Sequence, residues 1–132
     1  MDGRVVCASV TATIDREKKM MTKLEAIVQP SRFDSVKTAL IEIGVVGMTA
    51  SEVRGHGRQK GHTGSYHGHE YAVDLLPKIK IEIVVEDKFV DPAIEAITKS
   101  AATGNIGDGK IFIYKVDDAV RIRNKDRGTA AL

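Results

Sequence analysis

The chain of 132 residues contains no tryptophan, one cysteine, three prolines and only 5% aromatic residues. Because Cys7 has no partner cysteine, an internal disulfide bond is excluded, and a reducing, cytoplasmic compartment is favoured. The formal net charge is only +2, which argues against a protein whose main task is to hold nucleic acid. No apolar run approaches the roughly 20 residues that a membrane span needs. We therefore expect one globular, soluble domain.

Two nucleotide-binding signatures are also missing, the GxxxxGK[ST] loop and a GxGxxG turn that opens a helix. A different glycine-rich run is present at residues 103–113, where Gly104, Gly107 and Gly109 are followed by Lys110 and an apolar strand. Glycines let a backbone approach a ligand closely, and its N–H groups then face an anion such as phosphate. This run is a candidate phosphate-binding loop or, alternatively, a plain glycine-rich turn.

A second unusual segment, residues 55–76, holds five glycines and all four histidines of the chain, with almost no large aliphatic residue before Val73. Loops longer than about 12–15 residues are uncommon and usually functional. His67 and His69 lie two apart and could meet one metal ion, but no cysteine or carboxylate cluster completes a zinc-site spacing. Solvated loop histidines are the alternative.

The apolar periodicity predicts the order β-α-β-β-α-β, a ferredoxin-like α+β fold with an antiparallel sheet and a long loop between the second and third strands. Asp91 and Pro92 are expected to cap the second helix, and Gly44 to end the first. The expected elements are strands at 23–29, 45–54, 79–85 and 110–116, helices around 33–43 and 92–101, and a short edge strand at 117–123.

The last strand is apolar on both sides, with Ile111 and Ile113 on one and Phe112 and Tyr114 on the other. Since the helices can cover only one face, we expect the other face to be buried by self-association. Arg121 and Arg123 would point the same way on an extended segment. They would then form either a polyphosphate clamp or an exposed basic edge.

These motifs together resemble the PII signal-transduction family. The resemblance covers about residues 21–132, and residues 1–20 are expected to be a flexible N-terminal extension. It rests on Gly57-Arg58-Gln59-Lys60-Gly61-His62-Thr63, Glu70-Tyr71, Leu76-Pro77-Lys78, the glycine loop and Arg121-Ile122-Arg123, in this order.

The resemblance implies a homotrimer that binds ATP or ADP in clefts between subunits and regulates partners without being an enzyme. It implies 2-oxoglutarate binding with Mg²⁺ held by Gln59 beside ATP, since a keto acid offers two oxygens to a hard cation. The implied 2-oxoglutarate residues are Gln59, Lys60, Gly61 and Lys78. The implied nucleotide residues are Thr49, Gly57, Arg58, Gln59, Glu82, Val84, Gly107, Asp108, Gly109, Lys110, Arg121 and Arg123.

The family resemblance also implies partners, namely an ammonium channel, a nucleotidylyltransferase and nitrogen-assimilation enzymes or regulators, with no nucleic acid and no membrane insertion. Tyr71 matches the tyrosine that is nucleotidylylated in many relatives. Three departures stand out: His56 replaces a usual phenylalanine, His67 replaces the arginine that enters a channel mouth, and Gln29 replaces a basic residue near the keto-acid site.

Three other functions remain open at this point. An RNA-binding module shares the element order, but the Lys/Arg-Gly-Phe-type motif is missing. A metal-binding module of related fold would use the loop histidines. A nucleotide hydrolase would need a general base, for which Asp108 and His62 are the candidates.

Overall fold

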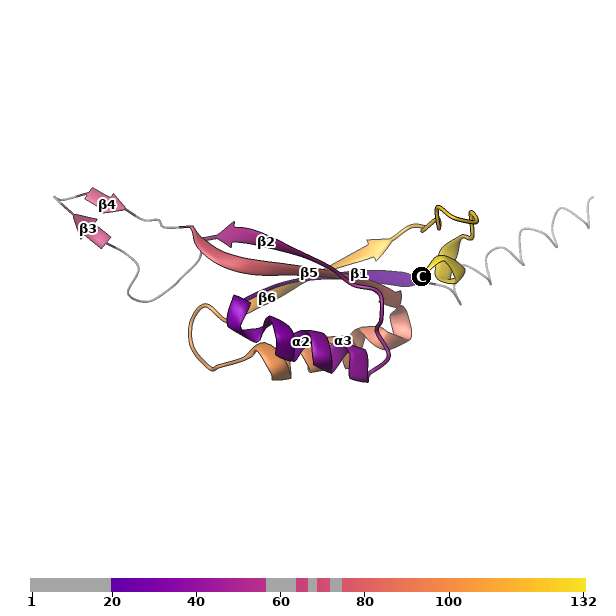
Figure 1. Cartoon of the computed structure of the whole chain (residues 1–132), viewed down its shortest axis with the longest axis horizontal. Coiled ribbons are helices and arrows are strands. Elements are labelled where there is room, and N and C mark those ends of the chain that lie inside the picture. The colour runs from indigo at the N-terminus through magenta and orange to yellow at the C-terminus, as the bar shows by residue number, and fades with distance from the viewer. Residues whose placement is uncertain (1–19, 57–63, 67–68, 72–74) are drawn as a thin grey trace, which may run out of the picture.

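The computed structural model describes residues 20–56, 64–66, 69–71 and 75–132, and for 64–66 and 69–71 it describes the backbone alone. Four strands form an antiparallel sheet in the order β2-β5-β1-β6, and two helices cover one of its faces (Figure 1). The expected ferredoxin-like order is confirmed. The elements are β1 (Met21–Val28), α2 (Phe33–Glu42), β2 (Thr49–Gly55), β5 (Leu76–Glu86), α3 (Val90–Ala101) and β6 (Gly109–Val116), with 3-10 turns at Pro30–Arg32, Asp87–Phe89 and Gly128–Ala131.

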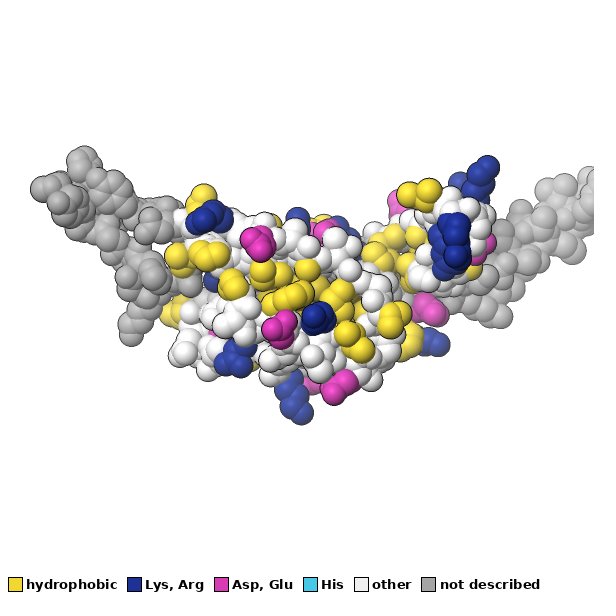
Figure 2. All heavy atoms as spheres, in the orientation of Figure 1, with side chains coloured by type: hydrophobic (Ala, Val, Ile, Leu, Met, Phe, Trp, Pro, Cys, Tyr) yellow, Lys and Arg dark blue, Asp and Glu magenta, His cyan; other side chains and the backbone are white. Residues whose placement is uncertain are grey.

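Alternation along the strands separates the two faces of the sheet. In β1, Leu24, Ala26 and Val28 are buried under the helices, whereas Lys23 and Glu25 lie on the uncovered face, here called the open face. On the face seen in Figure 2, hydrophobic side chains gather along the junction of the helix layer and the sheet. The core residues are Leu24, Ala26, Val28, Val36, Leu40, Val45, Ile81, Ile83, Val85, Ala93, Ile97 and Ala101.

Two expected element starts are wrong. The second strand begins at Thr49 rather than at residue 45, because Val45 is buried and its N–H is bonded to the carbonyl of Leu40 in the turn after α2. Gly44, with φ +98°, supplies that turn as expected. Asp91 is not the N-cap of α3, because the 3-10 turn extends the coil and places Asp91 inside the first helical turn.

The expected edge strand at 117–123 is also wrong. Val120 makes a single bridge to Arg127, and the intervening chain turns back on itself. The N–H of Lys125 donates to the carbonyl of Arg121, and the N–H of Arg121 donates to the carbonyl of Asp126. Arg121 and Arg123 therefore lie in a closed turn rather than on an extended segment.

Part of the long segment between β2 and β5 is regular. β3 (Gly64–Tyr66) and β4 (His69–Tyr71) pair antiparallel as a short hairpin (Figure 1). The expected loop thus contains a two-stranded element. The proposed extension at 1–20 falls almost wholly outside the described residues.

The open face of this single chain is apolar at β6 and charged at its centre. Phe112 and Tyr114 are 45% and 47% exposed. Lys23 bridges to Glu82 on the neighbouring β5 with Nζ and Oε2 2.7 Å apart, and its ammonium group lies 5.3 Å from the ring centre of Tyr114. The expectation of an apolar open face holds for the edge strand and fails for β1 and β5.

Candidate functional site

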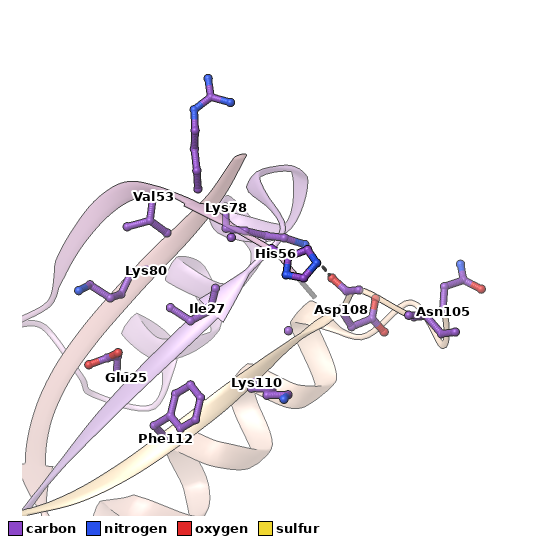
Figure 3. Close-up of a pocket in the computed structure, with 15 residues that line it drawn as sticks. Glu25, Ile27, Val53, His56, Lys78, Lys80, Asn105, Asp108, Lys110 and Phe112 are labelled. Carbon is purple, nitrogen blue, oxygen red and sulfur yellow. Dashed lines mark hydrogen bonds between the residues drawn. The ribbon is translucent and has the colours of Figure 1, made fainter. Parts of the chain in front are cut away.

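A cleft of about 970 Å³ lies on the open face where β1, β2, β5 and β6 approach the loop at residues 103–108 (Figure 3). This end of the sheet is fixed by the pairing of Val28 with Gly109 and of Gly55 with Leu76. The lining residues are Glu25, Ile27, Val53, Arg54, Gly55, His56, Lys78, Lys80, Asn105, Ile106, Gly107, Asp108, Gly109, Lys110 and Phe112.

The carboxylate of Asp108 closes the glycine loop from within. It accepts hydrogen bonds from the backbone N–H of Thr103 at 2.7 Å, the backbone N–H of Gly104 at 3.0 Å and the Thr103 hydroxyl. The Thr103 hydroxyl, followed by these backbone donors and the charge of Arg32, lowers the pKa of Asp108. Asp108 therefore shapes the loop, and its oxygens are occupied by donors from the loop itself.

The exit of the loop requires glycine at residue 109. Gly109 has φ +116°, and a β-carbon there would lie 1.8 Å from the carbonyl oxygen of Ile27 on β1. Gly107 also has a positive φ, of +103°. These conformations let the loop turn tightly onto β1 and bring its backbone to the wall of the cleft.

Two side chains hold the carbonyl of Gly107. The amide of Gln29 donates to this oxygen at 3.1 Å, and the ammonium group of Lys78 donates to it at 3.2 Å. Lys78 is only 9% exposed, and no carboxylate among the described residues lies within ion-pair distance of it. A buried ammonium group with a neutral carbonyl as its partner favours an anionic ligand beside it.

The charge of the cleft is positive. Arg54, Lys78, Lys80 and Lys110 line it, against the carboxylates of Glu25 and Asp108. Glycine-loop backbone next to several lysines can bind a phosphate or a carboxylate.

The structure brings together five of the residues expected to bind ligands. Thr49 and Val84 lie farther along the open face, and Glu82 pairs with Thr49 across the β2–β5 ladder. The hydrogen bond from Lys23 lowers the pKa of Glu82 and raises that of Lys23. The five residues that line the cleft are Lys78, Gly107, Asp108, Gly109 and Lys110.

The two expected arginines lie elsewhere in this chain. β6 runs from Gly109 at the cleft to Val116, about 23 Å at the usual rise per residue, before Arg121 and Arg123 are reached. Lys and Arg side chains gather over the C-terminal segment, at the far end of the sheet (Figure 2). One chain therefore cannot place the arginines beside Lys110.

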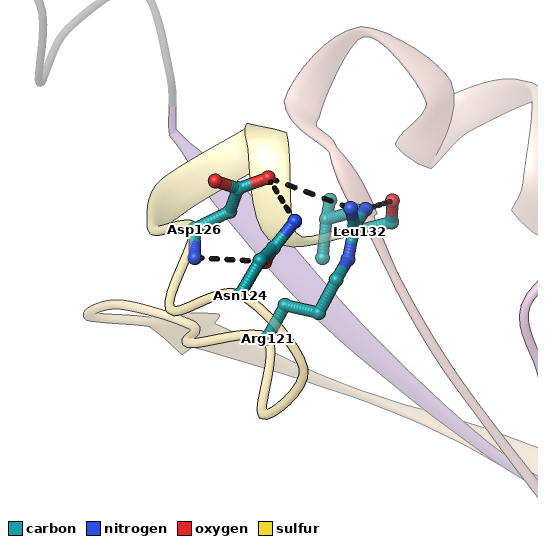
Figure 4. A network of polar contacts seen from close by, with 4 residues as sticks. All are labelled: Arg121, Asn124, Asp126 and Leu132. Carbon is teal, nitrogen blue, oxygen red and sulfur yellow. Dashed lines mark hydrogen bonds and ion pairs between the residues drawn. The ribbon is translucent and has the colours of Figure 1, made fainter.

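A local network holds Arg121 in place (Figure 4). Its guanidinium group lies 3.4 Å from Asp126 and donates to the carbonyl of Leu132 at 3.1 Å, while the Asn124 amide donates to the same Asp126 carboxylate. Arg123, in contrast, is exposed. The turn thus orients one arginine and leaves the other on the surface.

Several expected residues fall outside the part of the chain whose side chains the structure describes. They are Gly57, Arg58, Gln59, Lys60, Gly61, His62, His67, His69 and Tyr71. Among the residues that are described, no group of three metal-ligating side chains comes together. No helix in these same ranges has the length and apolar character needed to cross a membrane.

Sequence reasoning missed six side chains that the strands contribute to the cleft. Their signal was the alternation of each strand, since residues two apart share a face. Placing them at one end of the sheet, however, requires the strand register. The missed residues are Glu25, Ile27, Val53, Arg54, Lys80 and Phe112.

Comparisons with known proteins agree with this architecture. The profile of the family described as Nitrogen regulatory protein P-II matches residues 21–126. The chain is 57% identical over 112 residues to a Nitrogen regulatory protein P-II of Rhodospirillum rubrum, covering 85% of this chain and 100% of the relative. It is 53% identical to Nitrogen regulatory protein P-II 1 of Escherichia coli K12, with the same coverage.

Solved structures are similar as well. The structure of B. subtilis GlnK superposes with a TM-score of 0.71 at 36% identity, covering 86% of this chain and 99% of that one. The B. subtilis GlnK–ATP complex superposes with a TM-score of 0.73 at 35% identity, covering 87% of this chain and 98% of that one.

Proposed function

Because the chain belongs to the Nitrogen regulatory protein P-II family, whose members are signalling regulators and not enzymes, we propose that it reports nitrogen, carbon and energy status. It would do so by binding ATP or ADP together with 2-oxoglutarate. The observation that carries this proposal is the basic cleft formed by Lys78, Lys110 and the glycine loop that Asp108 closes. A similar solved structure is a complex with ATP.

The nucleotide site is proposed to form between two chains of a homotrimer. One chain would contribute Gly107, Gly109 and Lys110, and its neighbour Arg121 and Arg123. This arrangement accounts for the separation of these groups by the whole length of β6. The apolar side chains that β6 exposes supply a surface for the assembly. Thr49, Glu82 and Val84 would lie near the base and sugar.

The keto-acid site is proposed to lie at the Lys78 end of the cleft. Lys78 would pair with the distal carboxylate of 2-oxoglutarate, and the backbone of residues 57–61 would supply further anion contacts. Gln59 would hold Mg²⁺ beside the ATP phosphates, with the ion also chelated by the keto acid.

The long segment that links β2 to β5 is proposed to carry the output signal in the cytoplasm. Ligands bound at its base would select among its conformations, so ligand binding and partner binding would be linked. Candidate partners are an ammonium channel and nitrogen-assimilation enzymes or regulators. Tyr71 would be the site of nucleotidylylation.

A subunit-mixing experiment tests the shared nucleotide site. Lys110→Ala chains and Arg123→Ala chains are each expected to lose ATP affinity, by about 1.5–3 kcal/mol for each charge-assisted contact removed. When the two variants are dissociated and reassembled together, every mixed trimer regains one intact cleft. Tight ATP binding should therefore reappear in the mixture. Failure of the mixture to exceed either variant alone would contradict a shared site.

A calorimetric titration tests the keto-acid site. We expect 2-oxoglutarate to bind the wild-type chain with ATP and Mg²⁺ present, and binding to be lost in excess chelator or without ATP. Lys78→Gln should weaken 2-oxoglutarate binding more than ATP binding, with Lys99→Gln on α3 as a surface control. Equal 2-oxoglutarate affinity with and without Mg²⁺ would exclude the shared ion.

A further inference from the structure

The main-chain carbonyl of Gly107 is shared by two side-chain donors that come from different strands of the sheet. Gln29 follows directly after β1, and its amide Nε2 donates to this oxygen at 3.1 Å. Lys78 lies on β5, and its ammonium group donates to the same oxygen at 3.2 Å (Figure 3). Glycine is conformationally permissive, and Gly107 has φ +103°. The two hydrogen bonds therefore fix the orientation of the planar peptide between Gly107 and Asp108.

The two donors differ in their exposure to a ligand. Lys78 lines the cleft, and an ammonium group binds a carboxylate or a phosphate more strongly than it binds a neutral carbonyl. An anion in the cleft therefore competes with Gly107 for Lys78. Gln29 is half-buried and is not one of the described residues that line the cleft. Its amide is neutral, so it has no net charge with which to attract an anion.

The backbone around Gln29 is held by the turn that follows it. The carbonyl of Gln29 accepts a hydrogen bond from the N–H of Arg32 at 2.9 Å, across the 3-10 turn at Pro30–Arg32. The strand before Gln29 is tied to the exit of the glycine loop by the pairing of β1 with β6. Gln29 is therefore the fixed donor, and Lys78 is the donor that a ligand can draw away.

We propose that Gln29 is a positioning residue of the nucleotide site, which holds the glycine loop through the Gly107 carbonyl while an anionic ligand engages Lys78. The loop then keeps its backbone in place for the phosphates of a nucleotide. Without the Gln29 amide, the loop would depend on Lys78 alone and would be released when that ammonium group turned to the ligand. This inference rests on the proposed function, because it assumes that the glycine loop contacts the nucleotide.

The test is a double-mutant cycle on ATP affinity, measured by calorimetry with full-length wild type, Gln29→Met, Lys78→Met and the double variant. Methionine is similar in length to both side chains but has no N–H donor. Gln29→Met is expected to weaken ATP binding about two- to fivefold, because Lys78 still holds the carbonyl. The double variant should lose at least about threefold more than the product of the two single losses. The cycle cancels the direct attraction of the Lys78 charge for phosphate.

Two further variants and one spectrum separate positioning from general destabilisation. Gln29→Lys keeps a donor at this position and is expected to retain the wild-type ATP affinity. Thr22→Val removes a hydrogen bond at the opposite end of β1 and should leave ATP affinity unchanged. In isotope-labelled, nucleotide-free protein, the magnetic resonance signal of the Gly107 carbonyl carbon should move upfield in Gln29→Met and further in the double variant, but not in Thr22→Val.

The outcomes distinguish this role from the proposed function. Single losses that simply multiply in the double variant would overturn the role of Gln29 and leave the nucleotide site standing. A Gly107 carbonyl signal that does not move in Gln29→Met would do the same. Absence of ATP binding by the wild-type chain would overturn the proposed function, and the role of Gln29 in nucleotide binding with it.

Discussion

Gly109 lies so close to Ile27 that a β-carbon on Gly109 would be 1.8 Å from the Ile27 carbonyl oxygen. This approach joins the start of β6 to the end of β1, where Val28 pairs with Gly109. The glycine loop and the sheet are thus locked together at the wall of the cleft. A change at this contact disturbs the fold and the proposed ligand site at once.

Gly109→Ala is expected to lower the free energy of unfolding by at least about 2 kcal/mol, because the new methyl group meets backbone atoms and the residue has a positive φ. Urea denaturation followed by circular dichroism measures the change. Gly104→Ala is the matched control, since Gly104 also has a positive φ, of +85°, but no atom within 4 Å of the added β-carbon. Equal losses in the two variants would refute the steric explanation.

Thr22 is expected to stabilise the far end of the sheet through Asp87. Its side chain is buried and donates a hydrogen bond to the Asp87 carboxylate at 2.6 Å. Thr22→Val keeps the side-chain shape and should cost roughly 1–2 kcal/mol of unfolding free energy at pH 7. Lys115→Met, which removes an exposed ion pair to the same carboxylate, should cost less than about 1 kcal/mol.

The Thr22 effect should also depend on pH. The hydrogen bond from Thr22, followed by the hydrogen bond and charge of Lys115, lowers the pKa of Asp87 below its usual value. A carboxyl group whose pKa is lower in the folded than in the unfolded chain stabilises the fold at pH values above the usual aspartate pKa of about 3.9. This stabilisation is lost as the pH falls through the pKa of Asp87 in the folded chain. The difference between wild type and Thr22→Val should therefore shrink below about pH 4, as measured by urea denaturation from pH 2.5 to 7.

Asp108 should control the glycine loop in the same acidic range. Its pKa is lowered chiefly by the Thr103 hydroxyl, so the carboxylate holds the loop at neutral pH and releases it in acid. In a nuclear magnetic resonance titration, the amide signals of Thr103 and Gly104 should shift together, with a midpoint below about 3.9. Asp108→Asn should abolish this transition. The amide signal of Gly128, whose N–H donates to the Asp118 carboxylate, is the control and should still shift with pH in the Asp108→Asn chain.

Phe112→Asp is expected to disrupt the proposed trimer, because the exposed aromatic ring lies on the apolar edge strand β6. Sedimentation at micromolar concentration should show a shift from trimer toward single chains. Ile41→Asp is the control, since Ile41 is 50% exposed but lies on α2 in the helix layer. A wild-type chain that sediments as a monomer would exclude the trimer altogether.

The strand periodicity was sufficient to predict the fold, because Leu24 and Ala26 alternate with Lys23 and Glu25 and bury one face of β1. Element boundaries were harder to predict. Val45 is apolar and β-branched, as in a strand, yet it is buried in a turn that Gly44 closes. Asp91 followed by proline resembles a helix start, but the 3-10 turn at Asp87–Phe89 precedes it. In both places tertiary packing outweighs the local preference.

The cleft was predictable only in part for a related reason. Gly107, Gly109 and Lys110 lie within four residues of one another in the sequence, so their proximity in space could be predicted without knowledge of the fold. Glu25 and Lys80 reach the same cleft through strand register, which periodicity does not supply. The turn after Val120 depends on contacts among Arg121, Asp126 and the chain beyond them, which the spacing of two arginines does not reveal.

The length of β6 has a consequence for how a proposed assembly would respond to its ligands. The strand joins the glycine loop at one end to the arginine turn at the other. If the two ends serve different clefts, the β6 strand of each chain physically connects two ligand-binding sites. A shift of the glycine loop caused by one ligand would then move the arginines of the next cleft through the same strand. Ligand binding at the three proposed sites would therefore be coupled rather than independent.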